Sequence, residues 1–253
     1  MTSHPSTTFF HPVPIPIPTP ALAPALAPKS KSKSKSNIHL LPCDPLTDGP
    51  ALLAQQIAAF SNPHEPYFFV LFPEKEEREK AVKKLLDNWV SDKSARYVKI
   101  VDGEGTLISA AKWLVITEPL SEEQRKERIT VDWHLDEDSN EWAAYLMNWI
   151  HQHQIRRTKG EPCVILDILT THPSHQGLGA GTLLMQYGTA IADSLNLPAF
   201  IEGTAIAKHL YESHGFKAVL DRYIEVEVPE KWRGRPKIEF FFYERVRVGG
   251  RSE

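Results

Sequence analysis

The amino-acid sequence predicts an α/β (α+β) fold on the strength of three observations. Apolar residues recur at helical spacing in several windows, which indicates helices in both halves of the chain. Short apolar runs between turn residues indicate strands. One run, Cys163–Leu169, is followed by a glycine-rich turn and then by an amphipathic pattern, which is the order strand, turn, helix. After this unit the sequence looks mostly β.

The first 37 residues are predicted to be a disordered tail, and residues 38–253 a single domain. The tail contains eight prolines, four lysines and no acidic residue. Such a segment cannot bury enough apolar surface to offset its ordering entropy. The remaining residues hold 25 basic and 32 acidic side chains, a net charge of −7. The domain therefore lacks the basic footprint of a nucleic-acid-binding protein.

In the first part of the domain the patterns predict two helices and a hairpin. Leu52–Phe60 has helical spacing and follows turn residues. Pro73–Trp89 is expected to be helical because acidic residues fill its first turns, where the helix dipole favours them. Tyr97–Asp102 and Leu107–Ile116 are strand candidates, and Gly103–Gly105 between them predicts a hairpin.

Residues 117–160 are interpreted as an insertion. An acid-rich loop leads into an expected helix near 140–156 that carries aromatic residues on one face. Two interpretations of that face stay open: it packs on the sheet, or Trp133 or Trp142 lines a substrate pocket.

The second half of the domain is predicted to alternate strands and helices before a β-rich end. The strand 163–169 is followed by a helix over 180–195 and by a strand over Ala199–Glu202. A helix from about Thr204 to His214 is expected to end at Gly215, because glycine readily adopts the left-handed conformation of a helix C-terminus. Two long strands are expected near 217–228 and 237–247.

The glycine turn before residue 180 predicts a site for a phosphorylated cofactor. Unpaired N–H groups at a helix N-terminus and the helix dipole both favour an anion. The sequence has no Gly-Lys-Ser/Thr ending, which excludes an ATP-type phosphate loop. The dinucleotide pattern G-x-G-x-x-G is not met either, although Glu202 stands where a ribose-binding acid would lie. A dinucleotide-binding oxidoreductase therefore remains an alternative.

Three motifs together make the sequence resemble the GNAT superfamily of acyl-CoA N-acyltransferases, most closely its fungal members of unassigned substrate. They are Gln176-x-x-Gly179-x-Gly181, the preceding Thr171-His172-Pro173, and the Leu-Tyr-x-x-x-Gly-Phe pattern of Leu210–Phe216. The resemblance is clearest over residues 95–245. It implies a GNAT fold: a mixed, mostly antiparallel central sheet with helices on both faces. That sheet would splay between the strand ending at Leu169 and the one at Ala199, forming the acyl-CoA cleft.

The resemblance also implies how acetyl-CoA is held. Backbone N–H groups of the glycine turn would bind the pyrophosphate, and the N–H of Leu169 would polarise the thioester carbonyl, an effect worth roughly 3 kcal/mol when preorganised. Thr204 replaces the asparagine that many members carry seven residues before the tyrosine, which bears on how the cofactor's arm is held. The expected cofactor-binding residues are Leu169, Thr171, Gln176, Gly177, Leu178, Gly179, Ala180, Gly181, Thr182 and Thr204.

Two residues are expected to be catalytic. Tyr211 matches the family's general acid, which protonates the leaving thiolate; the alternative is a helix tyrosine packed on the sheet. Asp167 is an acid in an apolar strand, which is costly unless it is paired or functional. It lies nine residues before Gln176, where serotonin-type members carry a histidine that transfers protons. Pairing with a cation or a backbone N–H is the other interpretation of Asp167, and Glu202 is a second candidate base.

The function expected from the resemblance is direct transfer of acetyl from acetyl-CoA to a primary amine, in a ternary complex. The acceptor would be a small-molecule amine or a peptide amine, and its identity and the oligomeric state stay open. A non-catalytic acyl-CoA-binding or regulatory module of the same fold is the rival interpretation. No metal, membrane or nucleic-acid partner is expected. Cys43 and Cys163 make no disulfide framework, so a cytoplasmic location is expected, with a nuclear or mitochondrial one left open.

Overall fold

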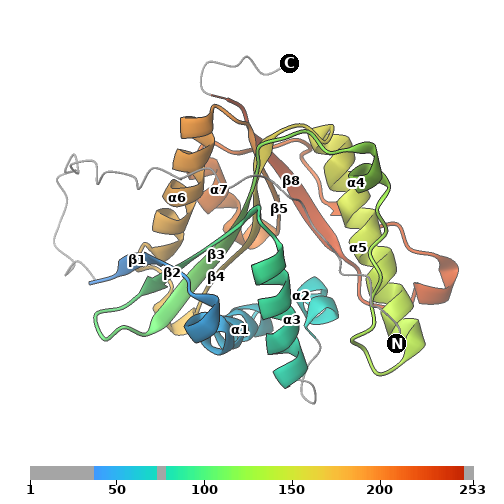
Figure 1. Cartoon of the computed structure of the whole chain (residues 1–253), viewed down its shortest axis with the longest axis horizontal. Coiled ribbons are helices and arrows are strands. Elements are labelled where there is room, and N and C mark those ends of the chain that lie inside the picture. Colours follow the sequence, from blue (N-terminus) through green and yellow to red (C-terminus); the bar gives the residue numbers. More distant parts are fainter. Residues whose placement is uncertain (1–36, 73–77, 248–253) are drawn as a thin grey trace.

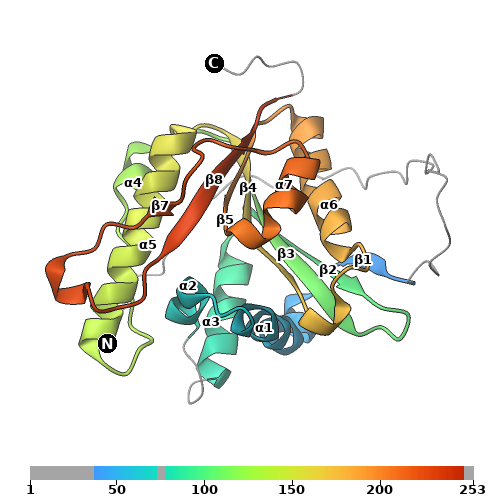
Figure 2. The ribbon, with the colours of Figure 1, turned by 180° about the vertical axis from the view of Figure 1, so that it is seen from behind.

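The computed structural model describes residues 37–72 and 78–247, drawn in Figures 1 and 2. The predicted tail, apart from Asn37, lies outside the described residues. So do the acidic residues at 74–77 that were expected to begin a helix. Among the helices that the structure describes, none is long and apolar enough to cross a bilayer.

The described strands form one open sheet in the order β1-β2-β3-β4-β5-β8-β6, with β7 also paired to β8. All neighbours are antiparallel except β4 and β5, which are parallel. The predicted mixed, mostly antiparallel sheet is therefore confirmed. The strands are β1 (His39–Pro42), β2 (Ala95–Val101), β3 (Leu107–Ile116), β4 (Cys163–Thr171), β5 (Ala199–Gly203), β6 (Lys217–Ala218), β7 (Ile224–Glu225) and β8 (Glu239–Arg245).

Helices cover both faces of this sheet, as the resemblance implied. On one face α6 packs against β3, β4 and β5 in the largest apolar cluster, and Tyr211 of α7 belongs to that cluster. On the other face α1 and α2 pack on β2 and β3, and α5 packs beside β8. Figure 1 shows the sheet between α6 and α5. The helices are α1 (Pro45–Ser61), α2 (Pro66–Leu71), α3 (Arg78–Ser91), α4 (Glu122–Lys126), α5 (Glu137–Thr158), α6 (Ala180–Leu195) and α7 (Lys208–Ser213).

The predicted hairpin is confirmed: it consists of β2 and β3. The conformation of its turn explains why Asp102 and Gly105 occur there. The Asp102 side chain accepts hydrogen bonds from the N–H groups of Glu104 and Thr106, at 3.0 and 2.9 Å. Gly105 has φ 85°, which glycine adopts without strain. Three short elements, β1, α2 and α4, were not predicted, because none is long enough to show a periodic pattern.

The prediction of one long strand over 217–228 is wrong. The segment pairs with β8 twice, as β6 and as β7, and the chain between them bulges. From Val219, whose N–H donates to Phe242, to Ile224, which pairs with Phe240, this segment advances five residues while β8 advances two. Apolar alternation on both sides of the bulge gives one continuous strand pattern in the sequence, so the bulge leaves no local signal.

The insertion at 117–160 contains α4 and α5, and α5 is longer than the predicted helix at 140–156. Trp142 is only 3% exposed and lies in an apolar cluster with Val226, Ile238 and Phe240. Its ring centroid is 5.3 Å from that of Trp232. Of the two interpretations of this helix face, packing on the end of the sheet is the one observed for Trp142.

Candidate active site

The parallel pair β4–β5 separates after a short contact, and we call this point the β4–β5 fork. Register pairs join Val164, Ile165 and Leu166 to Ala199, Phe200 and Ile201, and none follows them. On its other edge β4 stays paired to β3 as far as Thr171. Asp167 and Glu202 are thus the first residues of the two strands beyond the fork.

A β-bulge places Asp167 at this point. The β3–β4 register shifts between Lys112 and Trp113, which pair with Ile168 and Leu166, so that Asp167 is the extra residue. An extra residue of this kind re-aims a side chain and is common beside functional sites. The bulge leaves the Asp167 side chain 41% exposed although both of its strand neighbours are less exposed.

The ladder between β3 and β4 determines which way the N–H of Leu169 points. The N–H of His172 donates to the carbonyl of Ile108 at 2.8 Å, and the register runs without a shift from there to the pair Lys112–Ile168. Hydrogen-bonded and non-hydrogen-bonded pairs alternate along an antiparallel ladder. The pair Ala111–Leu169 is therefore non-hydrogen-bonded, and the N–H of Leu169 points away from β3, toward the fork. Thr171 has the same orientation, and its hydroxyl lies 2.8 Å from that of Ser109.

The glycine turn leads from β4 into α6, which runs back antiparallel to β4 (Figure 2). Ala180, the first residue of α6, lies in the same apolar cluster as Leu166 and Ile201, the last paired residues before the fork. Gly177 and Gly179 have φ 78° and 88°, where other residues are strained. Gly179 is the N-cap of α6 and provides no side-chain cap for the first N–H groups of the helix. The residues from Gln176 to Gly179 are exposed. The turn therefore presents an accessible helix N-terminus, which favours an anion.

Tyr211 lies on the α6 face of the sheet, next to the last residue of β5. A Cβ atom added at Gly203 would lie 2.7 Å from Cε2 of Tyr211 and 3.1 Å from its hydroxyl oxygen. A Cβ atom added at Gly181 would lie 3.0 Å from Cδ2 of the neighbouring Leu210, so α7 packs closely on the first turn of α6. Tyr211 is 6% exposed. Burial raises its pKa, so the hydroxyl keeps its proton at neutral pH.

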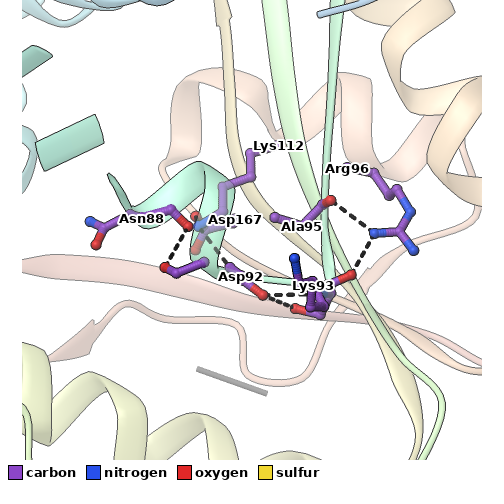
Figure 3. Close-up of polar contacts among 9 residues, drawn as sticks. Asn88, Asp92, Lys93, Ala95, Arg96, Lys112 and Asp167 are labelled. Atoms are coloured by element: carbon purple, nitrogen blue, oxygen red, sulfur yellow. Dashed lines mark hydrogen bonds and ion pairs between the residues drawn. The ribbon is translucent and has the colours of Figure 1, made fainter. Parts of the chain in front are cut away.

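Asp167 is paired with a cation, which is one of the interpretations left open for it (Figure 3). Lys112 Nζ lies 2.9 Å from its carboxylate and 4.0 Å from that of Asp92. Burial opposes the charge of Lys112, but Asp167, Tyr97 and Asp92 outweigh it and raise the lysine pKa. Lys112 is therefore a permanent cation shared between two carboxylates.

Glu202 is held by a histidine that the sequence analysis did not connect with it. His153 Nδ1 of α5 lies 3.0 Å from Oε1 of Glu202. Burial raises the pKa of Glu202; His153 opposes this, and the nearby carboxylate of Asp167 adds to it. The pair is separated by 49 residues, so no spacing rule would have found it.

Thr204 follows β5 and is the N-cap of a 3₁₀ turn, Ala205–Ala207, without a side-chain cap hydrogen bond. Thr182 lies exposed in the first turn of α6. The cofactor-binding candidates thus lie in three places: on β4 beyond the fork, in the glycine turn with the first turn of α6, and at Thr204 directly after β5. Within the described ranges, no group of three or more His, Cys, Asp or Glu side chains could hold a metal ion.

Comparison with known proteins gives one family and many similar structures. The model of the Acetyltransferase (GNAT) family matches residues 59–216, more than half of the chain. Drosophila melanogaster polyamine N-acetyltransferase, described as forming N-acetylagmatine, is 15% identical with a TM-score of 0.57, over 84% of this chain and 100% of that one. Arylalkylamine N-acetyltransferase 2 from Aedes aegypti is 12% identical with a TM-score of 0.58, over 83% and 99%.

An agmatine N-acetyltransferase is also similar, at 15% identity and a TM-score of 0.56, over 82% of this chain and 98% of that chain. At such identities these likenesses show a common fold. No curated protein sequence matches the chain.

Proposed function

Because the chain belongs to the GNAT family of acetyltransferases, we propose that it transfers an acetyl group from acetyl-CoA directly to a primary amine. The observation that carries this proposal is the β4–β5 fork. Beside it lie the N–H of Leu169, which points away from β3, the N-terminus of α6 without a side-chain cap, and the buried hydroxyl of Tyr211. These three groups fit the carbonyl, the pyrophosphate and the thiolate of an acyl-CoA in turn.

In the proposed reaction each group has one task. The N–H of Leu169 stabilises the oxyanion that forms when the amine nitrogen attacks the thioester carbon, and a donor of this kind is worth about 3 kcal/mol. The carbon–sulfur bond then breaks, and Tyr211 gives its proton to the thiolate. The phenolate regains a proton from the nitrogen, which completes the amide. No covalent enzyme intermediate is needed.

The amine must first lose a proton, because an alkylamine of pKa about 10.4 is an ammonium ion at neutral pH. Its deprotonation near pH 7 costs roughly 4.6 kcal/mol. A carboxylate at the fork can accept this proton, and Asp167 is the candidate that the sequence singled out. With Glu202 beside it, the α1–α2–α5 face of the fork carries two carboxylates, which supports a cationic acceptor. The similar structures named for polyamine, agmatine and arylalkylamine acetylation support small amines of that kind as the first to be tried.

Calorimetric titration with acetyl-CoA, CoA and NADH tests the proposal. We expect micromolar binding of acetyl-CoA and CoA and none of NADH, followed by thiol release when an amine panel is added. Binding of acetyl-CoA without any thiol release would favour the non-catalytic module. Binding of NADH without binding of acetyl-CoA would favour the dinucleotide-binding oxidoreductase and contradict the proposal.

The glycine turn gives a sharper test of the cofactor site. We expect Gly179→Ala to weaken acetyl-CoA binding about tenfold, because a side chain at φ 88° costs about 1–2 kcal/mol and distorts the N-terminus of α6. Gly105→Ala is the matched control: it has φ 85° and equally open space around it, but lies in the β2–β3 turn. Titration of both variants should show the loss in Gly179→Ala only; equal affinities would remove the turn from the cofactor site.

A further inference from the structure

The buried carboxylate of Glu202 lies at the end of β5, on the face of the sheet opposite Tyr211. Ile201 of β5 lies in the α6-side cluster, whereas Phe200 lies in the cluster of the opposite face with Phe242. Because side chains alternate along a strand, Glu202 projects to the side of Phe200, toward α5. Glu202 and Tyr211 therefore flank the end of β5 from opposite faces of the sheet.

A chain of two side chains orients this carboxylate. Arg157 Nε donates to His153 Nε2 at 3.3 Å, so Nε2 is the accepting nitrogen. The other ring nitrogen, Nδ1, must then carry the hydrogen and donate it to Glu202 at 3.0 Å. His153 itself is fixed by stacking on Trp149, at 5.5 Å between centroids, and by edge contacts with Phe240 and Phe242.

Burying the polar side chains of Glu202 and His153 among aromatic rings costs free energy, which a functional role would explain. The Glu202 side chain is 15% exposed and that of His153 is 6% exposed. The Glu202 carboxylate receives a hydrogen bond from the imidazole ring of His153, whereas the neighbouring Asp167 carboxylate is bound to the ammonium group of Lys112 at 2.9 Å. Of the two carboxylates at the fork, only Asp167 is paired with a lysine. Glu202 is therefore the better proton acceptor.

Charged and titratable groups of four packed elements face Glu202 in the described part of the chain. They are His153 and, behind it, Arg157 of α5, Asp167 of β4 with Lys112 of β3, and Tyr67 of α2. Burial raises the pKa of Tyr67, and the carboxylates of Asp167 and Glu202 raise it further, so its hydroxyl is a neutral hydrogen-bonding group beside them. The lysine and the arginine of this group contact Asp167 and His153 rather than Glu202.

We propose that Glu202, rather than Asp167, accepts the proton of the acceptor ammonium, with His153 and Arg157 as its positioning residues. This inference rests on the proposed acetyl transfer. The ammonium gives one proton to the carboxylate, which becomes a neutral acid, and the freed nitrogen lone pair attacks the thioester carbon. Solvent removes the proton from Glu202 after release of the amide. Asp167 holds the ammonium by its charge and keeps Lys112 in place.

The first test measures how the role of Glu202 depends on amine basicity. The probe is the best acceptor among agmatine, spermidine, tryptamine and phenethylamine, compared with its β,β-difluoro analogue, whose amine is far less basic. We expect Glu202→Gln to lower kcat/KM for the parent amine about 100-fold, the lower end of general-base effects. For the difluoro analogue, which needs little help in losing its proton, the loss should be under about tenfold.

Controls separate this role from a structural one. Glu239→Gln makes the same change at an exposed position of β8 and should leave both amines unaffected. Acetyl-CoA affinity and melting temperature of Glu202→Gln should match those of the wild type, since glutamine can still accept the hydrogen bond of His153. An equal loss with both amines would mean that Glu202 acts in structure or binding only and would overturn the proposal.

The pH profile provides the second test. A base must be deprotonated to act, so kcat/KM of the wild type should rise with pH as Glu202 ionises, later than for an ordinary glutamate because its pKa is raised. Glu202→Gln should flatten that rise, whereas Asp167→Asn should retain it. His153→Leu removes the donor and should move the rise to higher pH, and His153→Asn, which restores an N–H, should move it back.

Failure of the proposed function and failure of the role of Glu202 give different results. A wild type that acetylates none of the four amines sinks the proposed function, and this inference with it. An active wild type whose rise is flattened by Asp167→Asn but not by Glu202→Gln leaves the proposed function standing and assigns the proton to Asp167.

Discussion

Tyr211→Phe is expected to lower kcat about 100-fold while acetyl-CoA affinity stays within about twofold, which is the size of effect that a general acid contributes. The phenol lies at the end of β5, beside Gly203, and burial keeps it protonated. The ring of Tyr211 packs edge-on against that of Tyr243, with centroids 5.1 Å apart, and phenylalanine preserves this contact. The variant therefore removes the proton donor without disturbing the core.

The measurement is thiol release under saturating amine, with acetyl-CoA affinity from calorimetry. Tyr187→Phe is the matched control, since that tyrosine lies on α6 and packs at the margin of the same apolar cluster. Full activity in Tyr211→Phe would remove the hydroxyl from the mechanism and leave water as the donor. Loss of acetyl-CoA binding in the variant would instead assign Tyr211 a role in holding the cofactor.

Gly188→Ala is expected to destabilise the fold by about 2–3 kcal/mol, at the upper end of overpacking effects. A Cβ at Gly188 of α6 would lie 2.1 Å from Cε2 of Trp113, whose ring is fully buried and cannot move aside. Alanine gains about 1 kcal/mol of helix propensity over glycine, which is smaller than this clash. Because α6 carries the glycine turn at its N-terminus, a shift of the helix should also weaken acetyl-CoA binding.

Thermal unfolding measures the first effect, and a fall in Tm of about 5–10 °C is expected for a domain of this size. Gly49→Ala in α1 is the control, because the Cβ there would meet the end of a flexible side chain, Cδ2 of Leu86 at 2.7 Å. The control should lose far less stability. A Tm for Gly188→Ala equal to the wild type would show that α6 is not held against β3 in the way described.

How well each part of the candidate site could be predicted depends on how far apart its residues lie in the chain. The glycine turn was predictable because positive φ at Gly177 and Gly179 and the periodicity of α6 are local properties. Tyr211 was predicted because the local motif Leu210–Phe216 resembles that of the GNAT superfamily. The residue type and its immediate neighbours alone would not have predicted a catalytic role. Pairing of Asp167 with a cation or a backbone N–H was one of two open interpretations, and only the structure identified the partner as Lys112.

The strand–glycine–helix unit and the β2–β3 hairpin follow from the sequence alone, because hydrophobic periodicity and turn preferences act over a few residues. The tertiary structure alone decided the bulge at Asp167, the break between β6 and β7, and the contacts of Glu202 with His153. Each of these depends on strand register and on which helix packs over which strand. Register is set by the packing of the whole sheet, so residues far apart in sequence meet only once the core has formed.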